Sequence, residues 1–388
     1  MNNFNKAVKF HFIIILVTLF LGLIWLSFLY IFLVATYYGF KVLLKRIKNS
    51  FIYRTAYGLF VFLFIFFIAI SIKLFAFDIY KIPSSSMNNT LYTNDVIMVN
   101  KLKYGPKLPR SPFDIPWVNI AFYFNDKARA TMGTPWWDYK RLSGTTTIKK
   151  GDVIVFTMFD VDMVIVKRCI GKAGDTLTIK KGDVYVNNMA FNPSKLILNN
   201  YEFKVNDRKT FYSKLDSIDL DISFTRTRTN NFRATLSFQD KKRLEELNMV
   251  ESLVKVTDSL TDTSTAYPES KYNQWNFDDY GPYIIPQKGM KIILTPENYA
   301  LYHKVINEHE GVTIKNTEGT YSIKGKEVIS YTFKQDYYFM MGDHRKGSLD
   351  SRLWGVVPEE RIIGKVQCVL FSNYQDEFQW NRLFKFVN

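Results

Sequence analysis

The sequence is poor in cysteine, and its two cysteines, Cys169 and Cys368, stand far apart along 388 residues. No C-x-x-C spacing occurs, which excludes the cysteine-based zinc motifs and a fold held together by many disulfides. Each cysteine lies in an apolar run typical of a β-strand, which favours a buried thiol over a disulfide. The sequence implies no metal and no cofactor.

Acidic residues are also outnumbered. Lys and Arg total 51 against 36 Asp and Glu, giving a net charge of +15. Such a balance suits nucleic acid or anionic lipid as a partner. No compact arginine-rich tract and no nucleic-acid-binding motif is present, so lipid is the better match. Because the basic residues are dispersed, many of them fit an ordinary solvated surface.

Two long apolar runs lie near the N-terminus. Residues 12–37 carry no charge, and residues 55–72 form a second uncharged run that Lys73 can extend to 77 by snorkelling. About 20 apolar residues span the hydrocarbon of a bilayer. The runs therefore predict two transmembrane helices, about 12–37 and 55–77. A cleaved signal peptide has a shorter apolar region, whereas a buried helical hairpin of a soluble protein remains an alternative.

The connection between the two runs is basic. It holds no acidic residue and the following bases: Lys41, Lys45, Arg46, Lys48 and Arg54. The positive-inside rule places this loop in the cytoplasm, although Lys6 and Lys9 at the N-terminus oppose that orientation. Residues 1–77 are thus predicted to be a membrane anchor, and everything after Phe77 an extracytoplasmic domain.

That outer domain is expected to be mainly β. Short β-rich runs occur at residues 96–100, 152–156, 163–170, 183–187, 337–343 and 365–372. Two helices are expected, one capped by Ser237 and one capped by Thr295 with Pro296 at its first position. Residues 188–288 are polar and interrupt the strand pattern. They are predicted to be an inserted α+β subdomain in a β domain formed by 78–187 and 289–388. A second insertion, 104–150, contains Trp136 and Trp137, which suit either a lipid interface or packing under a loop.

A serine-rich segment, KIPSSSMNNTL at 81–91, follows the second apolar run. A serine nucleophile needs a base within hydrogen-bonding reach. A triad on His344 would use Asp343, but an aspartate adjacent in sequence rarely has the geometry to orient the ring. A lysine made neutral by burial is the other option, and Lys167 in its apolar run fits, although a strand lysine more often points to solvent.

Four segments resemble the conserved boxes of the type I signal peptidases. PSSSM at 83–87, with Thr90-Leu91 and DVIMVNK after it, resembles the nucleophile box. GDVIVF at 151–156 is similar to the strand that follows, and VKRCIGKAGD at 166–175 to the lysine box. GDHRKGSLDSRLWGVVPEERIIGKV at 342–366 is similar to the last box. The order is that of the family, and a two-span anchor precedes it.

The resemblance implies a signal-peptidase-like β fold and a serine–lysine endopeptidase of the bacterial cytoplasmic membrane. Ser86 would be the nucleophile and Lys167 the general base. Ser84 would donate to the oxyanion together with the Ser86 backbone N–H. Ser348 would hydrogen-bond the Lys167 amine. Asp350 and Arg352 would form a supporting pair, and Asp343 and Arg345 would do likewise.

The resemblance also implies the substrate. The family removes N-terminal signal peptides from exported preproteins after small residues, at a site of A-x-A type. Shallow pockets for those residues would be lined by Ile82, Pro83, Met87, Leu91 and Val166, which as bare sequence also suit a core. The chain departs from the family at Asn89, where proline is common, at His344, where asparagine is usual, and at Lys346-Gly347, which replaces a more acidic pair.

Two alternatives of other classes remain at this stage. A catalytically silent, membrane-tethered relative would bind export substrates in the same groove, but retention of Ser84, Ser86, Lys167 and Ser348 speaks against it. A self-cleaving repressor of similar serine–lysine fold gives no reason for two membrane spans and needs a DNA-binding module that the sequence lacks.

Overall fold

The computed structural model describes residues 2–158, 163–215, 224–228, 230–258 and 266–387, and its chain divides into two compact units. The first unit comprises residues 1–80, 98–148 and 363–366, and the second comprises 81–97, 149–362 and 367–388. Parts of the predicted insertion, at 216–223, 229 and 259–265, lie outside the described residues.

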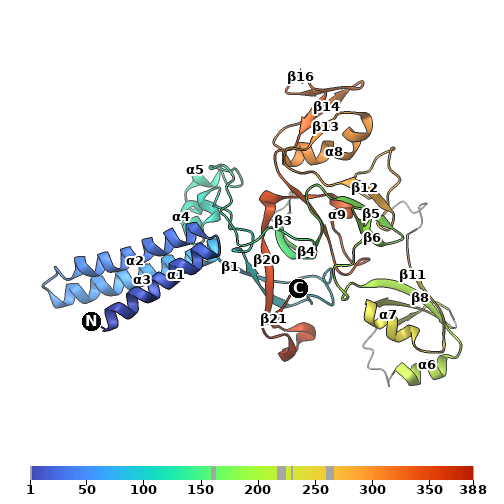
Figure 1. Ribbon diagram of the computed structural model, residues 1–388, viewed down its shortest axis with the longest axis horizontal. Helices are drawn as coiled ribbons and strands as arrows, with labels where there is room; N and C mark the ends of the chain where they lie inside the picture. The colour runs from blue at the N-terminus through green and yellow to red at the C-terminus, as the bar shows by residue number, and fades with distance from the viewer. Residues whose placement is uncertain (1, 159–162, 216–223, 229, 259–265, 388) are drawn as a thin grey trace. The chain divides into compact units, whose positions relative to one another are not determined.

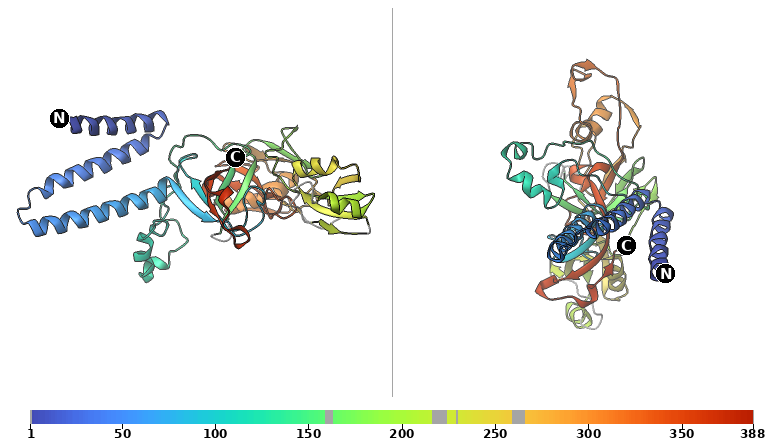
Figure 2. Two further views of the ribbon diagram at one scale, coloured as in Figure 1. Left: turned by 90° about the horizontal axis from the view of Figure 1, so that it is seen from below. Right: turned by 90° about the vertical axis from the view of Figure 1, so that its left-hand side faces the viewer.

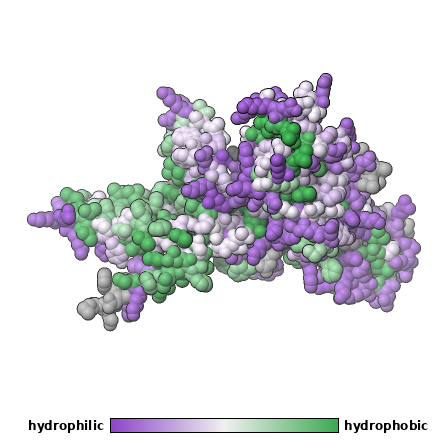
Figure 3. Space-filling model, turned by 45° about the horizontal axis from the view of Figure 1, so that its top comes forward, coloured by the Kyte–Doolittle hydropathy of each residue, from purple (hydrophilic) through white to green (hydrophobic). Residues whose placement is uncertain are grey.

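Helices dominate the first unit (Figures 1 and 2). They are α1 (Asn2–Phe20), α2 (Ile24–Leu44), α3 (Ser50–Phe75), α4 (Val118–Tyr123) and α5 (Asp126–Arg129), with a 3₁₀ turn at Pro112–Asp114. The strands β1 (Phe77–Lys81) and β2 (Asp95–Asn100) are neighbours in a sheet. Helices α2 and α3 are long and apolar enough to cross a membrane. Apolar side chains cover these helices, as the green surface in Figure 3 shows.

The single helix predicted for 12–37 is wrong, because the chain turns between α1 and α2. Gly22 has a φ of 73°, and its N–H donates to Leu19 O at 3.0 Å. The Leu23 N–H donates to Thr18 O at 2.9 Å. This pair of bonds is the Schellman motif, which ends helices at a glycine with a left-handed backbone. The first candidate span is therefore Ile24–Leu44 rather than 12–37.

The second unit is mainly β, as predicted. Its largest sheet places β20, β3, β4, β18 and β19 side by side, and β21 also pairs with β20. These strands span Ile362–Ser372, Val153–Thr157, Val164–Gly171, Tyr337–Met341, Val357–Pro358 and Lys385–Phe386. The sheet confirms the strands expected at 152–156, 163–170, 337–343 and 365–372. In the antiparallel pair of β3 and β4, Ile154 lies opposite Lys167.

The second unit also contains a second sheet and the helix α8 (Pro296–His309), which share one hydrophobic core. The sheet has the order β12 (Tyr280–Ile284), β5 (Thr176–Lys180), β6 (Asp183–Val186) and β7 (Met189–Ala190). Helix α8 begins at the predicted cap, where the Thr295 side chain accepts from Asn298 N–H. Its buried face, with Tyr302 and Ile306, packs in one core with the second sheet and with β13 (Lys291–Ile293), β14 (Ile314–Thr317), β15 (Thr320–Ile323) and β17 (Ser330–Thr332). The short β16 (Lys326–Glu327) pairs with β15.

The polar range 188–288 contains its own small core. One sheet has the strand order β11 (Val250–Lys255), β8 (Asn199–Val205), β10 (Asn231–Leu236) and β9 (Phe224–Arg226). The helices α6 (Arg208–Leu215) and α7 (Phe238–Glu245) contribute side chains to the same core. Helix α7 has the predicted cap, in which Ser237 and Asp240 exchange hydrogen bonds. Strand β12, from the same range, instead pairs with β5.

Candidate functional site

Ser86 lies in the segment that joins β1 to β2. The carbonyl of Met87 accepts from Thr90 N–H at 3.1 Å and from Leu91 N–H at 2.7 Å, so the chain makes a tight turn directly after the serine. Asn89 in this turn has a φ of 73°. Asparagine tolerates that left-handed conformation, whereas proline is fixed near −65°. The asparagine also donates through Nδ2 to Leu196 O at 2.9 Å, which ties the turn to the segment between β7 and β8.

The Lys167 side chain reaches Ser86 from β4. Its Nζ lies 2.6 Å from Ser86 Oγ, and Lys167 and Ser86 are only 5% and 8% exposed. Burial lowers the pKa of the Lys167 amine, while the nearby carboxylates of Asp350 and Asp343 counteract part of that effect. A lysine of lowered pKa holds a larger neutral fraction, and a neutral amine can accept the hydroxyl proton of serine.

A buried ion pair stands beside Lys167. The Arg168 guanidinium donates from Nε to Asp343 Oδ1 at 2.8 Å and from a terminal nitrogen to Oδ2 at 2.7 Å. Thr90 Oγ1 donates to the same carboxylate at 2.5 Å. Arg168 and Thr90 were missed in the sequence analysis, although both stand inside the quoted boxes.

The predicted pairing of Asp343 with Arg345 is wrong. Asp343 is engaged by Arg168, and no ion pair joins it to Arg345 among the described residues; the Arg345 guanidinium donates to Met341 Sδ at 3.8 Å. Burial lowers the pKa of Arg345 to about 10. Since Asp343 is occupied in this way, it is not available to orient His344. The His344 ring Nδ1 has no hydrogen-bond partner in the described part of the chain, so a Ser-His-Asp triad is not assembled.

Asp350 and Arg352 form a bidentate ion pair behind the site. Arg352 donates to the two oxygens of Asp350, with both nitrogen–oxygen distances at 2.9 Å. Asp350 Oδ2 also accepts from Gly342 N–H at 3.0 Å. Burial alone would raise the pKa of Asp350, but the Arg352 guanidinium prevails and holds it below the usual value. The pair thereby fixes the backbone at Gly342.

Gly342 is closely packed between two serines of the site. A Cβ at this position would lie 2.2 Å from Ser348 Oγ and 2.6 Å from the Ser86 carbonyl oxygen. Ser348 is buried, and no hydrogen bond joins its hydroxyl to Lys167; the hydroxyl instead faces Asp350, whose pKa it helps to lower. The expected hydrogen bond from Ser348 to the lysine is therefore absent between these described residues. Ser84 is exposed, and its Oγ lies 3.4 Å from Ser86 Oγ.

The residues expected to line the substrate pockets differ in exposure. Ile82, Met87 and Leu91 are buried, Val166 is half-buried and Pro83 is exposed. Only Pro83 and Val166 of this set therefore present substantial surface to a ligand. The other three support the turn that carries Ser86.

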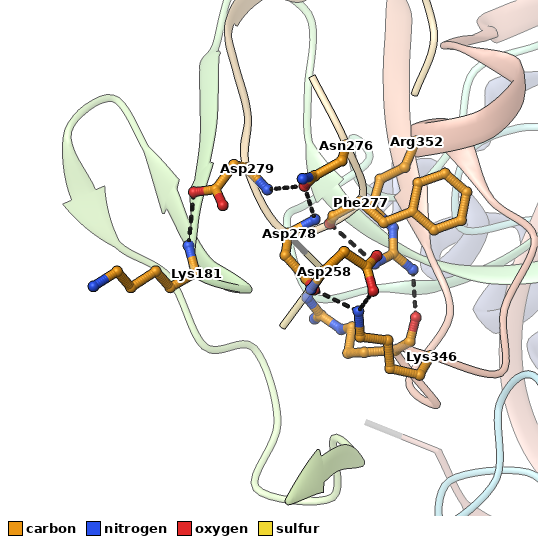
Figure 4. Close-up of polar contacts among 9 residues, drawn as sticks. Lys181, Asp258, Asn276, Phe277, Asp278, Asp279, Lys346 and Arg352 are labelled. Carbon is orange, nitrogen blue, oxygen red and sulfur yellow. Dashed lines mark hydrogen bonds and ion pairs between the residues drawn. The ribbon is translucent and has the colours of Figure 1, made fainter. Parts of the chain in front are cut away.

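A second polar network holds the far side of the Asp350–Arg352 pair (Figure 4). Arg352 donates to the Arg345 carbonyl at 2.6 Å, and its guanidinium lies over the Phe277 ring. The Lys346 ammonium forms ion pairs with Asp258, at 2.6 Å, and with Asp278. The basic departure at 346 thus has two acidic partners in the chain that follows β11, which the sequence comparison with the family could not reveal.

The described residues contain no group of three or more His, Cys, Asp or Glu side chains that could hold a metal ion. Ser86 and Lys167 place a hydroxyl beside a buried amine.

Comparison with known proteins identifies a family. The family described as signal peptidase, peptidase S26, matches residues 54–252 and 280–371. The chain is 25% identical over 311 residues to signal peptidase I of Buchnera aphidicola from Acyrthosiphon pisum, covering 80% of this chain and 73% of that protein. It is 23% identical over 306 residues to signal peptidase I of Helicobacter pylori J99, covering 79% and 78%. It is also similar, over a shorter stretch, to signal peptidase I of Haemophilus influenzae: 38% identical over 63 residues, covering 16% of this chain and 18% of that protein.

Proposed function

The chain belongs to the signal peptidase family, peptidase S26, and from this we propose that it removes N-terminal signal peptides from exported preproteins with a serine–lysine dyad. The observation that carries the proposal is the 2.6 Å contact between Lys167 Nζ and Ser86 Oγ in a buried setting. That contact puts a nucleophile and a base of lowered pKa in direct reach.

The reaction follows from this pair. The Ser86 hydroxyl gives its proton to the neutral Lys167 amine while Oγ bonds to the scissile carbonyl carbon. The resulting oxyanion accepts hydrogen bonds from the Ser86 backbone N–H and the Ser84 hydroxyl, donors of a kind worth about 3 kcal/mol each. The C–N bond then breaks, and the lysine proton passes to the leaving amine. Water then attacks the acyl-serine and gives a proton to Lys167; the bond between Ser86 Oγ and the acyl carbon breaks, and the proton returns from Lys167 to Ser86 Oγ.

Asp350, Arg352 and Ser348 support the site without contacting the scissile bond. Asp350 holds the Gly342 N–H, and Gly342 packs against the Ser86 carbonyl, so the Asp350–Arg352 pair positions the nucleophile turn. Ser348 lies against the same glycine and completes the wall.

The substrate would be an extended peptide with small residues at the first and third positions before the cut. Pro83 and Val166 would contact those residues directly. Ile82, Met87 and Leu91, which are buried, would set the depth of the pockets from behind.

Membrane placement follows from the helices. Helices α2 and α3 would span the bilayer, with the basic residues between 41 and 54 in the cytoplasm. The chain after α3 would then lie on the extracytoplasmic side of a bacterial cytoplasmic membrane, where signal peptides of exported preproteins emerge. Its partners are these peptides and the phospholipid bilayer.

A turnover assay tests the proposal against a silent relative. The full chain in phospholipid vesicles is given a synthetic peptide with an A-x-A site, and mass spectrometry maps the products. We expect cleavage after the second alanine by the unmodified chain and by Ser85→Ala, and none by Ser86→Ala. Absence of turnover by the unmodified chain, with peptide binding retained, would favour the silent relative.

A further inference from the structure

An apolar surface that the proposed reaction does not use lies in the insertion between β2 and β3. Large apolar side chains are exposed there around α4 and α5, namely Trp117, Val118, Ile120, Tyr123, Phe124, Met132, Trp136 and Trp137. Phe124 is 79% exposed and Trp117 is 60% exposed. Contiguous exposed apolar surface of this kind marks an interaction site.

The insertion is attached to the membrane helices of its own unit. The Trp117 ring lies 6.0 Å from the Phe66 ring of α3, measured between centroids. Ser143 Oγ donates to Gly22 O at 3.1 Å, and Trp25 Nε1 donates to Ser143 O at 2.9 Å. Phe66 stands nine residues before the end of α3 at Phe75. At 1.5 Å per residue, Trp117 therefore contacts α3 about 14 Å inside the end of that helix.

The Trp117 backbone supports a fixed placement of this ring. Its φ is 69°, a left-handed conformation that is unfavourable for a bulky side chain. Such a conformation costs about 1–3 kcal/mol and persists only where the surroundings enforce it. Trp117 directly precedes α4, and its ring contacts Phe66 of α3.

Two cavities lie beside α4, and both are lined by Phe113, Asn119 and Ile120. The larger, of about 540 Å³, reaches the end of α3 and adds the charged and polar side chains of Lys73, Asp78, Tyr80 and Asp114. Asp78 forms an ion pair with Lys101, and Asp114 accepts from backbone N–H groups. The smaller, of about 230 Å³, adds the apolar side chains of Tyr123, Phe124 and Met132. The Lys73 ammonium has no acidic partner among the described residues and is exposed.

We propose that residues 112–137 form an interfacial lipid-binding element that holds a phospholipid, its acyl chain in the apolar cavity and its phosphate beside Lys73. The occupant is lipid rather than another protein because the surface continues that of α3, which the bilayer would surround. Tryptophan and tyrosine favour the boundary between headgroups and hydrocarbon, and basic pockets there bind lipid phosphates. This inference rests on the proposed membrane placement and extends it to a segment without a spanning helix.

Depth measurements with a single fluorophore test the inference. An environment-sensitive label is placed on cysteine in Phe124→Cys, in Phe62→Cys of α3 and in Phe238→Cys of α7. Each residue is exposed, and the native Cys169 and Cys368 are buried. The full-length variants are reconstituted in vesicles of phosphatidylethanolamine and phosphatidylglycerol, with or without brominated acyl chains. We expect quenching and a blue shift at 62 and 124, and neither at 238.

The labels at 62 and 124 distinguish failure of the lipid-binding element from failure of the proposed membrane placement. Quenching at 62 without quenching at 124 would overturn the lipid-binding element and leave the membrane placement standing. No quenching at 62 would remove the placement itself, and with it the inference. Peptide cleavage, measured in the same vesicles, tests the proposed activity independently of either result.

A photoreactive phosphatidylglycerol tests the cavity. Its diazirine-bearing acyl chain is expected to crosslink to peptides within residues 113–132. Ile120→Trp should abolish this crosslinking because Ile120 lines both cavities, whereas Val118→Trp, which lines neither, should retain it. Crosslinking absent from the unmodified chain, or unchanged in Ile120→Trp, would overturn the site.

Discussion

Arg168 and Asp343 form a bidentate ion pair in which both side chains are fully buried. The two residues stand 175 positions apart in the sequence. It joins β4, which carries Lys167, to the segment that follows β18. Thr90, from the turn after Ser86, donates to the same carboxylate. One buried anion therefore connects the three parts of the chain that build the site.

Breaking that pair should destabilise the second unit. Arg168→Met leaves the Asp343 carboxylate buried without a counter-charge, a change that costs about 3–5 kcal/mol. Chemical denaturation in detergent, followed by circular dichroism, measures the free energy of unfolding. Lys204→Met is the matched control, since its pair with Glu251 is exposed and worth about 0–1 kcal/mol. Equal losses for the two variants would contradict the structural role of the Arg168–Asp343 pair.

The pH dependence of cleavage should report Lys167. The base works only when neutral, so kcat/KM should rise as pH rises through the lowered pKa of Lys167, below the ordinary value of 10.5. Burial lowers the pKa of Lys167, and the negative charge of Asp350 raises it again in part. Asp350→Asn removes that charge, so the acidic limb of the profile should move to lower pH. Glu251→Gln, at the exposed pair with Lys204, should leave the limb in place. A shift of the limb to higher pH in Asp350→Asn would refute this assignment.

The close packing at Gly342 predicts a sensitive position. Gly342→Ala would force the Ser86 carbonyl and the Ser348 side chain to move. Displacements of about 1 Å at a reacting group can cost about 100-fold in rate, and a loss of that order in kcat is expected. Gly58→Ala in α3, where no heavy atom lies within 4 Å of the added Cβ, should retain activity.

The left-handed backbone of Asn89, in the turn after Ser86, makes this position sensitive to substitution. Asn89→Pro is expected to destabilise the fold by about 3 kcal/mol or more, because the φ of 73° is closed to proline. Asn89→Gly keeps that conformation and should lose only about 1 kcal/mol, through the hydrogen bond to Leu196. A proline variant as stable as the glycine variant would show that the turn is not held as described.

Local patterns in the sequence predicted local structure well. The caps at Ser237 and Thr295 fixed the starts of α7 and α8, since those hydrogen bonds involve residues within one turn. The break at Gly22 was missed because a glycine in an apolar run does not by itself stop a helix. Gly39 and Gly58 remain helical within α2 and α3.

Long-range pairing was beyond the sequence. Asp343 was matched with Arg345, a neighbour along the chain, but its partner is Arg168 on a strand that only the folded sheet brings close. The same reason applies to Lys346, whose acidic partners stand 88 and 68 residues away. The proximity of Ser86 and Lys167 was expected from family resemblance alone, because no periodicity joins a turn at 86 to a strand at 167.

The most direct test of the serine–lysine account is the cleavage rate of Lys167→Met, compared with that of the unmodified chain in the same vesicles. Methionine keeps the length and the burial of the side chain but cannot accept a proton. General-base assistance is worth about 10²–10⁴-fold, so a fall in kcat of at least about 100-fold is predicted, with the circular dichroism spectrum unchanged. A folded Lys167→Met variant that cleaves the A-x-A peptide at the unmodified rate would contradict the account.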